Sequence, residues 1–268
     1  MAAVGFIGLG SQGAPMAHRI ADAGMDLVVW ARRPEATAPY AARGVPIAES
    51  LTDLGRRCGH IGICVLDDAG VLELCEVLIP VMAPGSVIAV HATILPETCE
   101  VLDRRCREAG LQFVDAAVSG GGTVAAAGKL TVMCGATVEA FAAARPVFET
   151  FGSLVVLLGP TGSGQRAKLV NNALLSANLA MGDAALSAAA AFGLDRAALV
   201  EVIGASSGRS LGFELAGRPV VMADFAHGSR LLLKDLDLLA RSIPGNEGAT
   251  ILNNAAADFL RSKLRQPE

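Results

Sequence analysis

Short runs rich in β-branched residues alternate with helix-like stretches over residues 1–160 of this chain. The predicted strands are VGFIGL (4–9), DLVVWA (26–31), HIGICVL (60–66), SVIAVHA (86–92), QFVDAAVS (112–119), LTVMCG (130–135) and LVVLLG (154–159). Helical patterns separate the earlier strands, for example over residues 14–23, 71–82 and 96–110. Strands that alternate with helices form βαβ units with right-handed crossovers. The pattern therefore predicts an α/β domain with a mostly parallel, doubly wound sheet.

The strand pattern ends at the stretch GPTGSGQ (159–165). Residues 165–192 then predict one long helix, which Gly193 ends, and the remainder of the chain is also helical in pattern. We therefore predict an α/β domain over residues 1–161 and an all-α C-terminal domain over residues 162–268. Because the long helix is apolar and rich in alanine on several faces, we expect it to pack against a partner subunit in a homodimer or homotetramer.

The composition is 52% hydrophobic and 18% charged, which predicts a sizeable core and argues against a disordered chain. The formal charge is −4, and lysines and arginines are scattered, which argues against a nucleic-acid or anionic-membrane partner. The apolar residues 173–192 are interrupted by Asn178 and Asp183, so we interpret them as a buried helix. The six cysteines form no CxxC pair, which predicts buried thiols in a cytoplasmic protein without a metal site.

Three glycines, Gly8, Gly10 and Gly13, lie between the first predicted strand and the first predicted helix. In a G-x-G-x-x-G turn the glycines permit the tight turn, the approach of a pyrophosphate and close helix–strand packing. The anion then meets free N–H groups at the positive end of the helix dipole. A glycine turn that serves packing alone is the alternative. The strand–turn–helix context favours a Rossmann domain that binds a dinucleotide through Gly8, Leu9, Gly10, Ser11, Gln12 and Gly13.

The second predicted strand ends in Ala31, Arg32 and Arg33, where an NAD-binding domain normally carries an acidic residue. Arginines at this position suit the 2′-phosphate of NADP(H), to which a guanidinium donates charge-assisted hydrogen bonds. Two solvated arginines at a sheet edge are the alternative. Glu35 lies close enough in sequence to keep NAD(H) in consideration. The pattern favours NADP(H) as the cofactor.

Five segments together resemble the β-hydroxyacid dehydrogenase family, the 3-hydroxyisobutyrate dehydrogenase group, in their order and spacing. They are GFIGLGSQGAPMA, HATILPET, DAAVSGGGTVAAAGKLTVMCG, GSGQRAKLVNNALL and LLLKDLDLLA. The resemblance covers nearly the whole chain. It implies a nicotinamide-dependent oxidoreductase with an N-terminal Rossmann domain, a helical C-terminal domain, and catalysis in the cleft between them.

Lys168 and Asn172 are four residues apart on the predicted long helix and so share one of its faces. Hydride transfer between a carbinol and nicotinamide requires a proton to leave or join the oxygen, and a lysine in a dry cleft can do this work. The resemblance implies that Lys168 is the catalytic proton donor or acceptor, with Asn172 orienting lysine and substrate. A surface lysine on an alanine-rich helix is the alternative.

The strand of residues 112–119 ends in a serine followed by glycines. A hydroxyl beside backbone amides without side chains is a natural cradle for a carboxylate. The resemblance implies that Ser119, Gly120 and Gly121 bind the substrate carboxylate, although Ala117 stands where the family usually has proline. An ordinary glycine turn is the alternative.

The resemblance also implies cofactor contacts from four further residues: Leu66, Asp67, Thr93 and Lys234. His91, at a strand end, is more typical of a structural histidine than of a catalytic base. Asp235 is expected to fix helix packing through an ion pair.

These features predict an NADP(H)-preferring oxidoreductase that transfers a hydride between nicotinamide and a small 2- or 3-hydroxy acid or its oxo or semialdehyde form. An imine reductase on the same scaffold is one alternative, but such relatives usually have Asp or Tyr at the position of Lys168. A catalytically silent NADPH-binding sensor or scaffold is the other.

Overall fold

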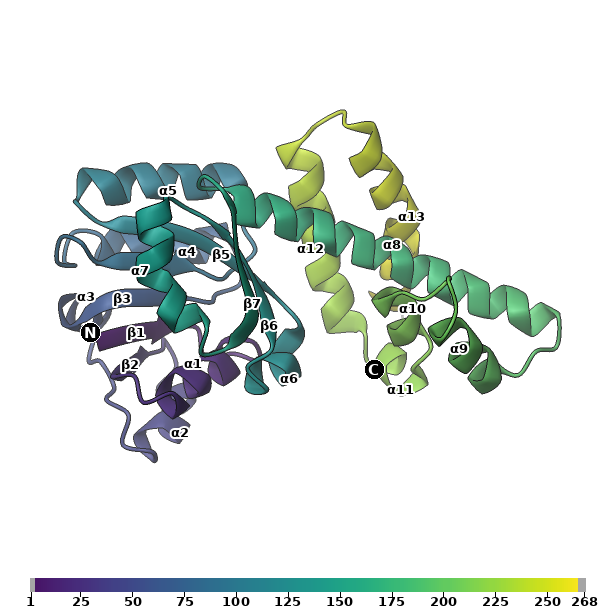
Figure 1. The fold of residues 1–268 in the computed structure, drawn as a ribbon, viewed down its shortest axis with the longest axis horizontal. Coiled ribbons are helices and arrows are strands. Elements are labelled where there is room, and N and C mark those ends of the chain that lie inside the picture. The colour runs from purple at the N-terminus through teal and green to yellow at the C-terminus, as the bar shows by residue number, and fades with distance from the viewer. Residues whose placement is uncertain (1–2, 265–268) are drawn as a thin grey trace. The chain divides into compact units, whose positions relative to one another are not determined.

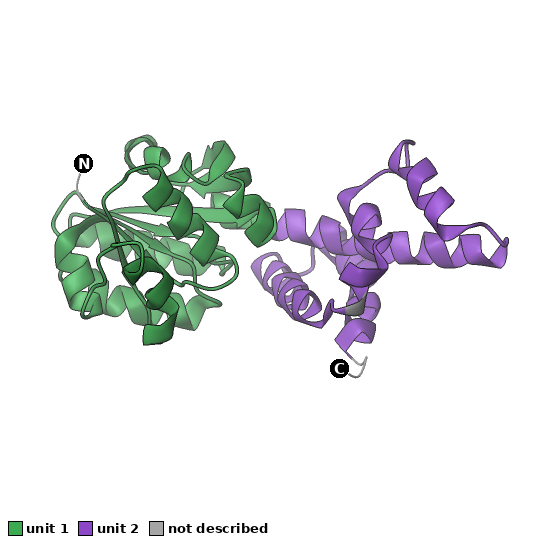
Figure 2. Ribbon diagram, turned by 90° about the horizontal axis from the view of Figure 1, so that it is seen from below, with its two compact units in different colours: residues 1–168 green, residues 169–268 purple. Residues whose placement is uncertain are grey.

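The computed structural model describes residues 3–264, except for the side chain of Ala223. The chain divides into two compact units, Met1–Lys168 and Leu169–Glu268, which are coloured separately in Figure 2.

The first unit is built on a single sheet of seven strands within the described residues (Figure 1). The strands are β1 (Ala3–Ile7), β2 (Leu27–Trp30), β3 (Cys58–Ile63), β4 (Val87–Val90), β5 (Gln112–Ser119), β6 (Leu130–Gly135) and β7 (Gly152–Gly159). Their order is β2-β1-β3-β4-β5-β6-β7, which confirms the predicted doubly wound topology. Neighbouring strands are parallel except β5 and β6, which pair antiparallel. The segment between these two strands is too short for the crossover that parallel strands require.

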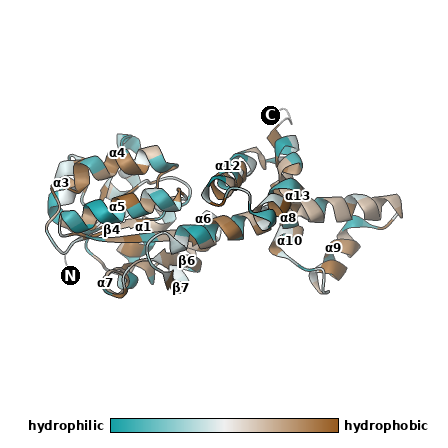
Figure 3. Cartoon of the chain, turned by 90° about the horizontal axis from the view of Figure 1, so that it is seen from above, coloured by the Kyte–Doolittle hydropathy of each residue, from teal (hydrophilic) through white to brown (hydrophobic). Residues whose placement is uncertain are grey.

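Helices cover both faces of this sheet. They are α1 (Gly13–Asp22), η1 (Pro34–Thr37), α2 (Ala38–Ala41), α3 (Leu51–Arg57), α4 (Asp68–Leu78), α5 (Pro96–Glu108), α6 (Gly121–Ala126) and α7 (Val138–Phe148). Because successive strand side chains point to opposite faces, Phe6 joins one hydrophobic cluster and Ile7 joins the other. Polar and apolar residues alternate around α5 in Figure 3, and its buried residues include Cys99, Leu102 and Cys106 at helical spacing. The sheet therefore has two cores, one on each side.

The second unit is entirely helical in its described residues. It contains most of α8 (Ser163–Ala191), followed by α9 (Arg196–Gly204), α10 (Leu211–Ala216), α11 (Pro219–Ala223), α12 (Ala226–Ser242) and α13 (Glu247–Leu264). A small core of Leu186, Phe213 and Ala216 joins α8 to α10. By length and hydropathy alone α8 would also suit a membrane span, but its buried polar residues Asn172 and Ser176 are typical of a core helix.

The helix predicted over residues 165–192 is observed as α8, and its first residues lie in the sheet unit, which extends to Lys168. The reason is that the first turn of α8 is fastened to β5. The buried carboxylate of Asp115 accepts hydrogen bonds from the N–H groups of Gly162 (2.7 Å) and Gln165 (2.9 Å). The first turn of the long helix thereby belongs to the sheet unit.

Candidate dinucleotide and substrate site

The glycine-rich loop connects β1 to α1, as the motif predicts. A Cβ added at Gly13 would lie 1.9 Å from the carbonyl oxygen of Gly8, so this close approach of helix and loop requires glycine. At Gly10 the situation differs, because no described atom outside its neighbours lies within 4 Å of an added Cβ. Gly13 therefore serves packing, whereas Gly10 leaves open space above the loop.

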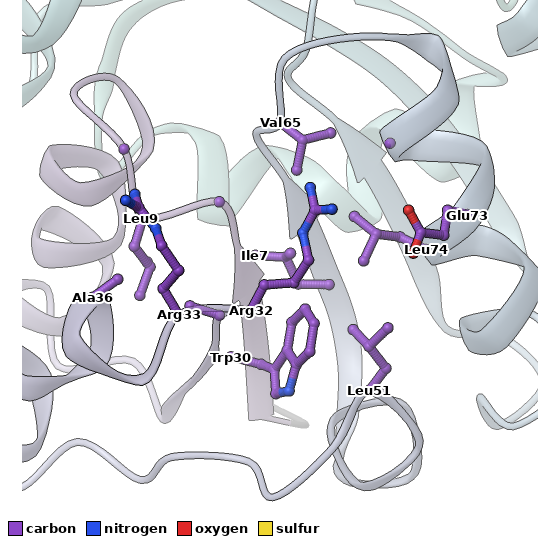
Figure 4. A pocket seen from close by; sticks show the side chains of 14 residues that line it. Ile7, Leu9, Trp30, Arg32, Arg33, Ala36, Leu51, Val65, Glu73 and Leu74 are labelled. Carbon is purple, nitrogen blue, oxygen red and sulfur yellow. The ribbon is translucent and has the colours of Figure 1, made fainter.

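That space belongs to a pocket of about 260 Å³ (Figure 4). The pocket is lined by Ile7, Gly8, Leu9, Gly10, Trp30, Ala31, Arg32, Arg33, Ala36, Leu51, Val65, Gly70, Glu73 and Leu74. Among the described residues, no side chain caps the N-terminus of α1, and the Gln12 amide points instead toward the sulfur of Met16 at 3.9 Å. Uncapped N–H groups at the positive end of a helix suit a pyrophosphate, so the loop fits a dinucleotide.

Arg32 and Arg33 lie just past the end of β2, on the wall of this pocket. Both guanidinium groups are drawn in Figure 4, with Glu73 on the opposite wall. Arg33 Nε lies 4.0 Å from the carboxylate of Glu35, and both side chains are mostly exposed. The pocket thus offers two cations, with the Glu73 carboxylate on its wall and the Glu35 carboxylate near Arg33, and both arginines are exposed and accessible to an anion.

The serine–glycine turn lies directly against the glycine-rich loop. Ser119 is the last residue of β5 and is half-buried, and the following Gly120 and Gly121 have φ angles of +134° and +77°. A Cβ added at Gly122 would lie 2.4 Å from the carbonyl oxygen of Ser11. The structure therefore brings together two motifs that are more than a hundred residues apart in the sequence.

The half-buried Thr93 lies in the loop after β4, and the side chain of Gln165 holds this loop. Gln165 Nε2 donates to the carbonyl oxygen of Ala92 (2.8 Å), and Ile94 N–H donates to Gln165 Oε1 (3.2 Å). Gln165 is fully buried and lies in the first turn of α8, three residues before Lys168. Within the first unit, the Thr93 loop and the start of the Lys168 helix are therefore bonded to each other.

Asp115 is fully buried beneath this turn. Burial raises the pKa of its carboxyl group to about 6, although hydrogen bonds from backbone N–H groups oppose the shift. Near neutral pH the group is therefore still ionised, and its negative charge lies at the N-terminus of a 29-residue helix.

Leu66 and Asp67 follow β3. The Leu66 side chain is 61% exposed. The Asp67 carboxylate caps α4 by accepting a hydrogen bond from Gly70 N–H (3.0 Å). Its neighbour Asp68 accepts hydrogen bonds from Leu95 N–H (3.0 Å) and the Thr98 hydroxyl (2.6 Å). Both carboxylates therefore accept hydrogen bonds within the fold. The Asp68 carboxylate binds the end of the Thr93 loop that leads into α5.

His91 is buried in the sheet unit, as a structural histidine would be. Its Nδ1 lies 2.9 Å from the carbonyl oxygen of Ala116, and its ring packs edge-on against Phe148 and Phe151. Burial lowers the pKa of His91 to about 4, so the ring is neutral at physiological pH.

In the second unit, Asn172 on α8 forms a cluster with two residues of α12. Asn172 Nδ2 donates to the Asp235 carboxylate at 2.6 Å, and Lys234 Nζ lies 3.3 Å from the other oxygen of Asp235. Asn172 and Asp235 are both buried, whereas Lys234 is partly exposed. Asp235 does form an ion pair, but with its neighbour on the same helix, so the contact that joins α12 to α8 is the hydrogen bond to Asn172.

Two family models match this chain. The NAD binding domain of 6-phosphogluconate dehydrogenase matches residues 3–159, and the NAD-binding domain of NADP-dependent 3-hydroxyisobutyrate dehydrogenase matches residues 162–266. The chain belongs to the β-hydroxyacid dehydrogenase family. Like its relatives it is a nicotinamide-dependent dehydrogenase or reductase.

Relatives in this family are similar over most of their length. The NAD-dependent L-serine dehydrogenase of Pseudomonas aeruginosa is 33% identical, over 99% of this chain and 93% of the relative. The mitochondrial 3-hydroxyisobutyrate dehydrogenase of Homo sapiens is 30% identical, over 96% of this chain and 80% of the relative. A solved 3-hydroxyisobutyrate dehydrogenase of Mycobacterium tuberculosis with L-serine superposes with a TM-score of 0.87 at 25% identity, covering 98% of this chain and 95% of that one.

The sequence patterns did not identify two residues of this β-hydroxyacid dehydrogenase, namely Asp115 and Gln165. Asp115 interrupts the apolar run FVDAAV, and a charged residue inside a buried strand is a signal of an internal hydrogen-bonding role. Gln165 gave no comparable signal, because polar residues are common in the first turn of a helix.

Proposed function

We propose that this chain is an NADP(H)-preferring dehydrogenase or reductase of a small 2- or 3-hydroxy acid or its oxo or semialdehyde form. Lys168 gives or takes the proton, and Asn172 orients the reacting groups. Ser119, Gly120 and Gly121 bind the carboxylate. The residues that hold the cofactor are Gly8, Leu9, Gly10, Ser11, Gln12, Gly13, Arg32, Arg33, Leu66, Asp67, Thr93 and Lys234.

The observation that carries the cofactor preference is the position of Arg32 and Arg33. Both line the same pocket as Gly8 and Gly10, and Ala31 stands where a carboxylate would bind the ribose hydroxyls of NAD(H). Two accessible guanidinium groups favour a 2′-phosphate through charge-assisted hydrogen bonds. Glu73 on the pocket wall and Glu35 near Arg33 oppose this preference, so NAD(H) is the alternative cofactor.

The substrate class rests on the serine–glycine turn and on the relatives. Their names specify L-serine, 3-hydroxyisobutyrate and 2-(hydroxymethyl)glutarate, all of them hydroxylated carboxylic acids. The Ser119 hydroxyl and the backbone N–H groups of the glycine turn suit a carboxylate, and the turn packs against the loop proposed for the cofactor.

The nicotinamide ring, when bound, accepts or supplies the hydride. Lys168 moves the proton of the substrate hydroxyl or carbonyl oxygen, for which an ammonium on a flexible stem is well suited. Asn172 is one turn along the same helix, and its hydrogen bond to Asp235 fixes the orientation of its amide. Its Oδ1 accepts a hydrogen bond from the Asn171 amide (3.1 Å).

We also propose that the protein forms a homodimer or homotetramer in the cytoplasm. Val170, Leu174 and Met181 on α8 are each more than half exposed. Their spacing of four and seven residues places them on one face of the helix, which a second copy of this chain would cover. Light scattering coupled to size-exclusion chromatography measures this directly.

Turnover assays of the purified protein test the proposed reaction. NADP and NAD are compared against 3-hydroxyisobutyrate, L-serine, glycerate and 4-hydroxybutyrate and, in the reverse direction, their oxidised forms. We expect a higher kcat/KM with NADP(H), and we expect Arg32→Ala with Arg33→Ala to reduce this preference at least tenfold while NAD(H) kinetics change little. A clear preference of the wild type for NAD(H) would contradict our interpretation of the two arginines.

Lys168→Ala separates the candidate activities. We expect loss of at least a hundredfold in kcat with unchanged NADPH affinity, because the proton-transfer group is removed and the dinucleotide loop is intact. Turnover of cyclic imines but not of hydroxy acids by the wild type would indicate an imine reductase. NADPH binding without turnover of either class would indicate a sensor or scaffold.

A further inference from the structure

The Gln165 side chain makes two hydrogen bonds to one short stretch of backbone, on either side of Thr93. Its Nε2 donates to Ala92 O at 2.8 Å and its Oε1 accepts from Ile94 N at 3.2 Å. Gln165, Ala92 and Ile94 are all buried, so water does not compete for these bonds. Two bonds from one planar amide fix both the position and the orientation of the loop between them.

The chemistry of this contact is specific to an amide. A carbonyl oxygen requires a donor and an N–H group requires an acceptor, and a side-chain amide presents both from one rigid plane without titrating. A leucine of similar size would leave Ala92 O and Ile94 N–H unpaired in the core. An ionised carboxylate would satisfy Ile94 N–H but would place a negative charge against Ala92 O.

The backbone from which Gln165 projects is itself fixed. Asp115 accepts hydrogen bonds from Gly162 N–H and from Gln165 N–H, and a Cβ added at Gly164 would lie 2.3 Å from the carbonyl oxygen of Met133. This turn of α8 is therefore pressed against β5 and β6. Lys168, three residues after Gln165, is the next residue on that side of the helix.

We infer that Gln165 is a positioning residue, whose amide holds the Thr93 loop in register with the turn of α8 that carries Lys168. The inference rests on the proposed function of Lys168 and Thr93. We call the two hydrogen bonds of the Gln165 amide to Ala92 and Ile94 the clamp. The clamp sets the position of the cofactor's reactive end, which Thr93 contacts, relative to Lys168, which moves the proton. Because the glycine-rich loop and the arginines hold the rest of the dinucleotide, the clamp affects turnover more than cofactor affinity.

Gln165→Leu removes both hydrogen bonds and is the first test. We expect kcat to fall about 10- to 100-fold, as for other small displacements of reacting groups. NADPH affinity, measured by its fluorescence on binding, changes no more than threefold. In hydrogen–deuterium exchange, the amide of Ile94 exchanges faster because its acceptor is lost.

Arg166→Gln is the matched control. Arg166 lies on the same turn, is exposed, and pairs with Glu100 of α5 at 2.5 Å. We expect kcat and the exchange of residues 92–95 to stay at wild-type values in this variant. An equal fall of kcat in Arg166→Gln and Gln165→Leu would show that any loosening of this turn suffices, and would overturn the assignment to Gln165.

Gln165→Glu tests the hydrogen bonds of this side chain separately from its packing. The introduced carboxyl has nearly the same shape, and in its protonated form it still donates to Ala92 O and accepts from Ile94 N–H. Burial raises the pKa of such a group. The ratio of variant to wild-type kcat should therefore approach one at pH 5.5 and fall at least tenfold toward pH 9, whereas the ratio for Gln165→Leu should be independent of pH. A pH-independent ratio for Gln165→Glu would overturn the proposal.

The two proposals fail differently. Full activity of Lys168→Ala would refute the proposed role of that lysine, but the exchange of Ile94 would still report whether Gln165 holds the loop. Inactivity of Lys168→Ala combined with unchanged kcat and unchanged exchange in Gln165→Leu would refute the clamp alone.

Discussion

At the scale of single residues, buried polar side chains with more than one partner organise this protein. Asp115 holds the start of α8, Gln165 holds the Thr93 loop, and Asp235 holds Asn172. Each is buried, and each binds a residue or segment for which we propose a direct role in the reaction. A buried polar group that loses its partner destabilises the folded protein by about 1–3 kcal/mol, so substitution of these residues should be destabilising.

We expect Asp235→Ala to lower the free energy of unfolding by about 1–3 kcal/mol, because the Asn172 amide would lose its carboxylate partner in the core. The kcat should fall as well, since Asn172 would no longer be oriented. Asp237→Ala on the same helix is the control, because Asp237 is exposed and forms a surface i,i+4 ion pair with Arg241. Urea denaturation and steady-state kinetics measure both effects, and equal losses in the two variants would count against a special role for Asp235.

At the scale of elements, the β1–α1 unit shows that the glycines of one motif have different functions. Gly13 allows helix and loop to approach, and Gly10 leaves space over the loop. The motif predicts these separate functions, with the pyrophosphate approaching at the second glycine and the helix packing at the third.

The variants Gly13→Ala and Gly10→Ala distinguish the packing function of Gly13 from the cofactor-binding function proposed for Gly10. We expect Gly13→Ala to lower the melting temperature markedly, because the added methyl group would overlap the Gly8 carbonyl oxygen. Gly10→Ala should keep a melting temperature close to that of the wild type and should weaken NADPH binding at least tenfold, because the methyl group would occupy the space proposed for the pyrophosphate. Thermal denaturation and NADPH fluorescence titration measure the two quantities. Wild-type NADPH affinity in Gly10→Ala would place the cofactor elsewhere.

At the scale of the whole molecule, stability depends on pH through three buried groups of the sheet unit. Burial lowers the pKa of His60 to about 3 and that of His91 to about 4, and it raises the pKa of Asp115 to about 6. Below pH 6.5 the histidines of the unfolded chain take up protons that the folded chain does not, so they lower stability as the pH falls. Asp115 acts in the opposite direction, since the folded chain binds its proton more readily than the unfolded chain does.

Two histidines outweigh one aspartate, so we expect the free energy of unfolding to be lower by about 2–3 kcal/mol at pH 5 than at pH 7.5. His60→Phe should reduce this difference by about three quarters, because one of two similar histidine contributions is removed while the opposing contribution of Asp115 stays. His227, which is exposed on α12, provides the control His227→Gln, for which we expect an unchanged pH dependence. Urea denaturation at both pH values gives the measurement, and a stability that does not fall toward pH 5 would contradict it.

The sequence by itself determined the alternation of strands and helices, the nucleotide-type domain, the long helix and the family. These follow from local patterns, namely β-branched runs, helical periodicity, the glycine turn and the order of five short segments. Site residues within such motifs, among them Gly8, Arg32 and Ser119, could be named for the same reason. The roles assigned to them stay predictions.

Only the tertiary structure decided which distant residues meet. The antiparallel pairing of β5 with the next strand, β6, is visible only in the folded sheet. The contact of Gly122 with the Ser11 carbonyl and the bonds of Asp115, Gln165 and Asp235 all join segments far apart in the sequence. A hydrogen bond between such segments leaves no local periodicity, because its partners are chosen by the packing of the whole unit. Gln165, which joins the Thr93 loop to the turn carrying Lys168, could therefore be identified only from the folded structure.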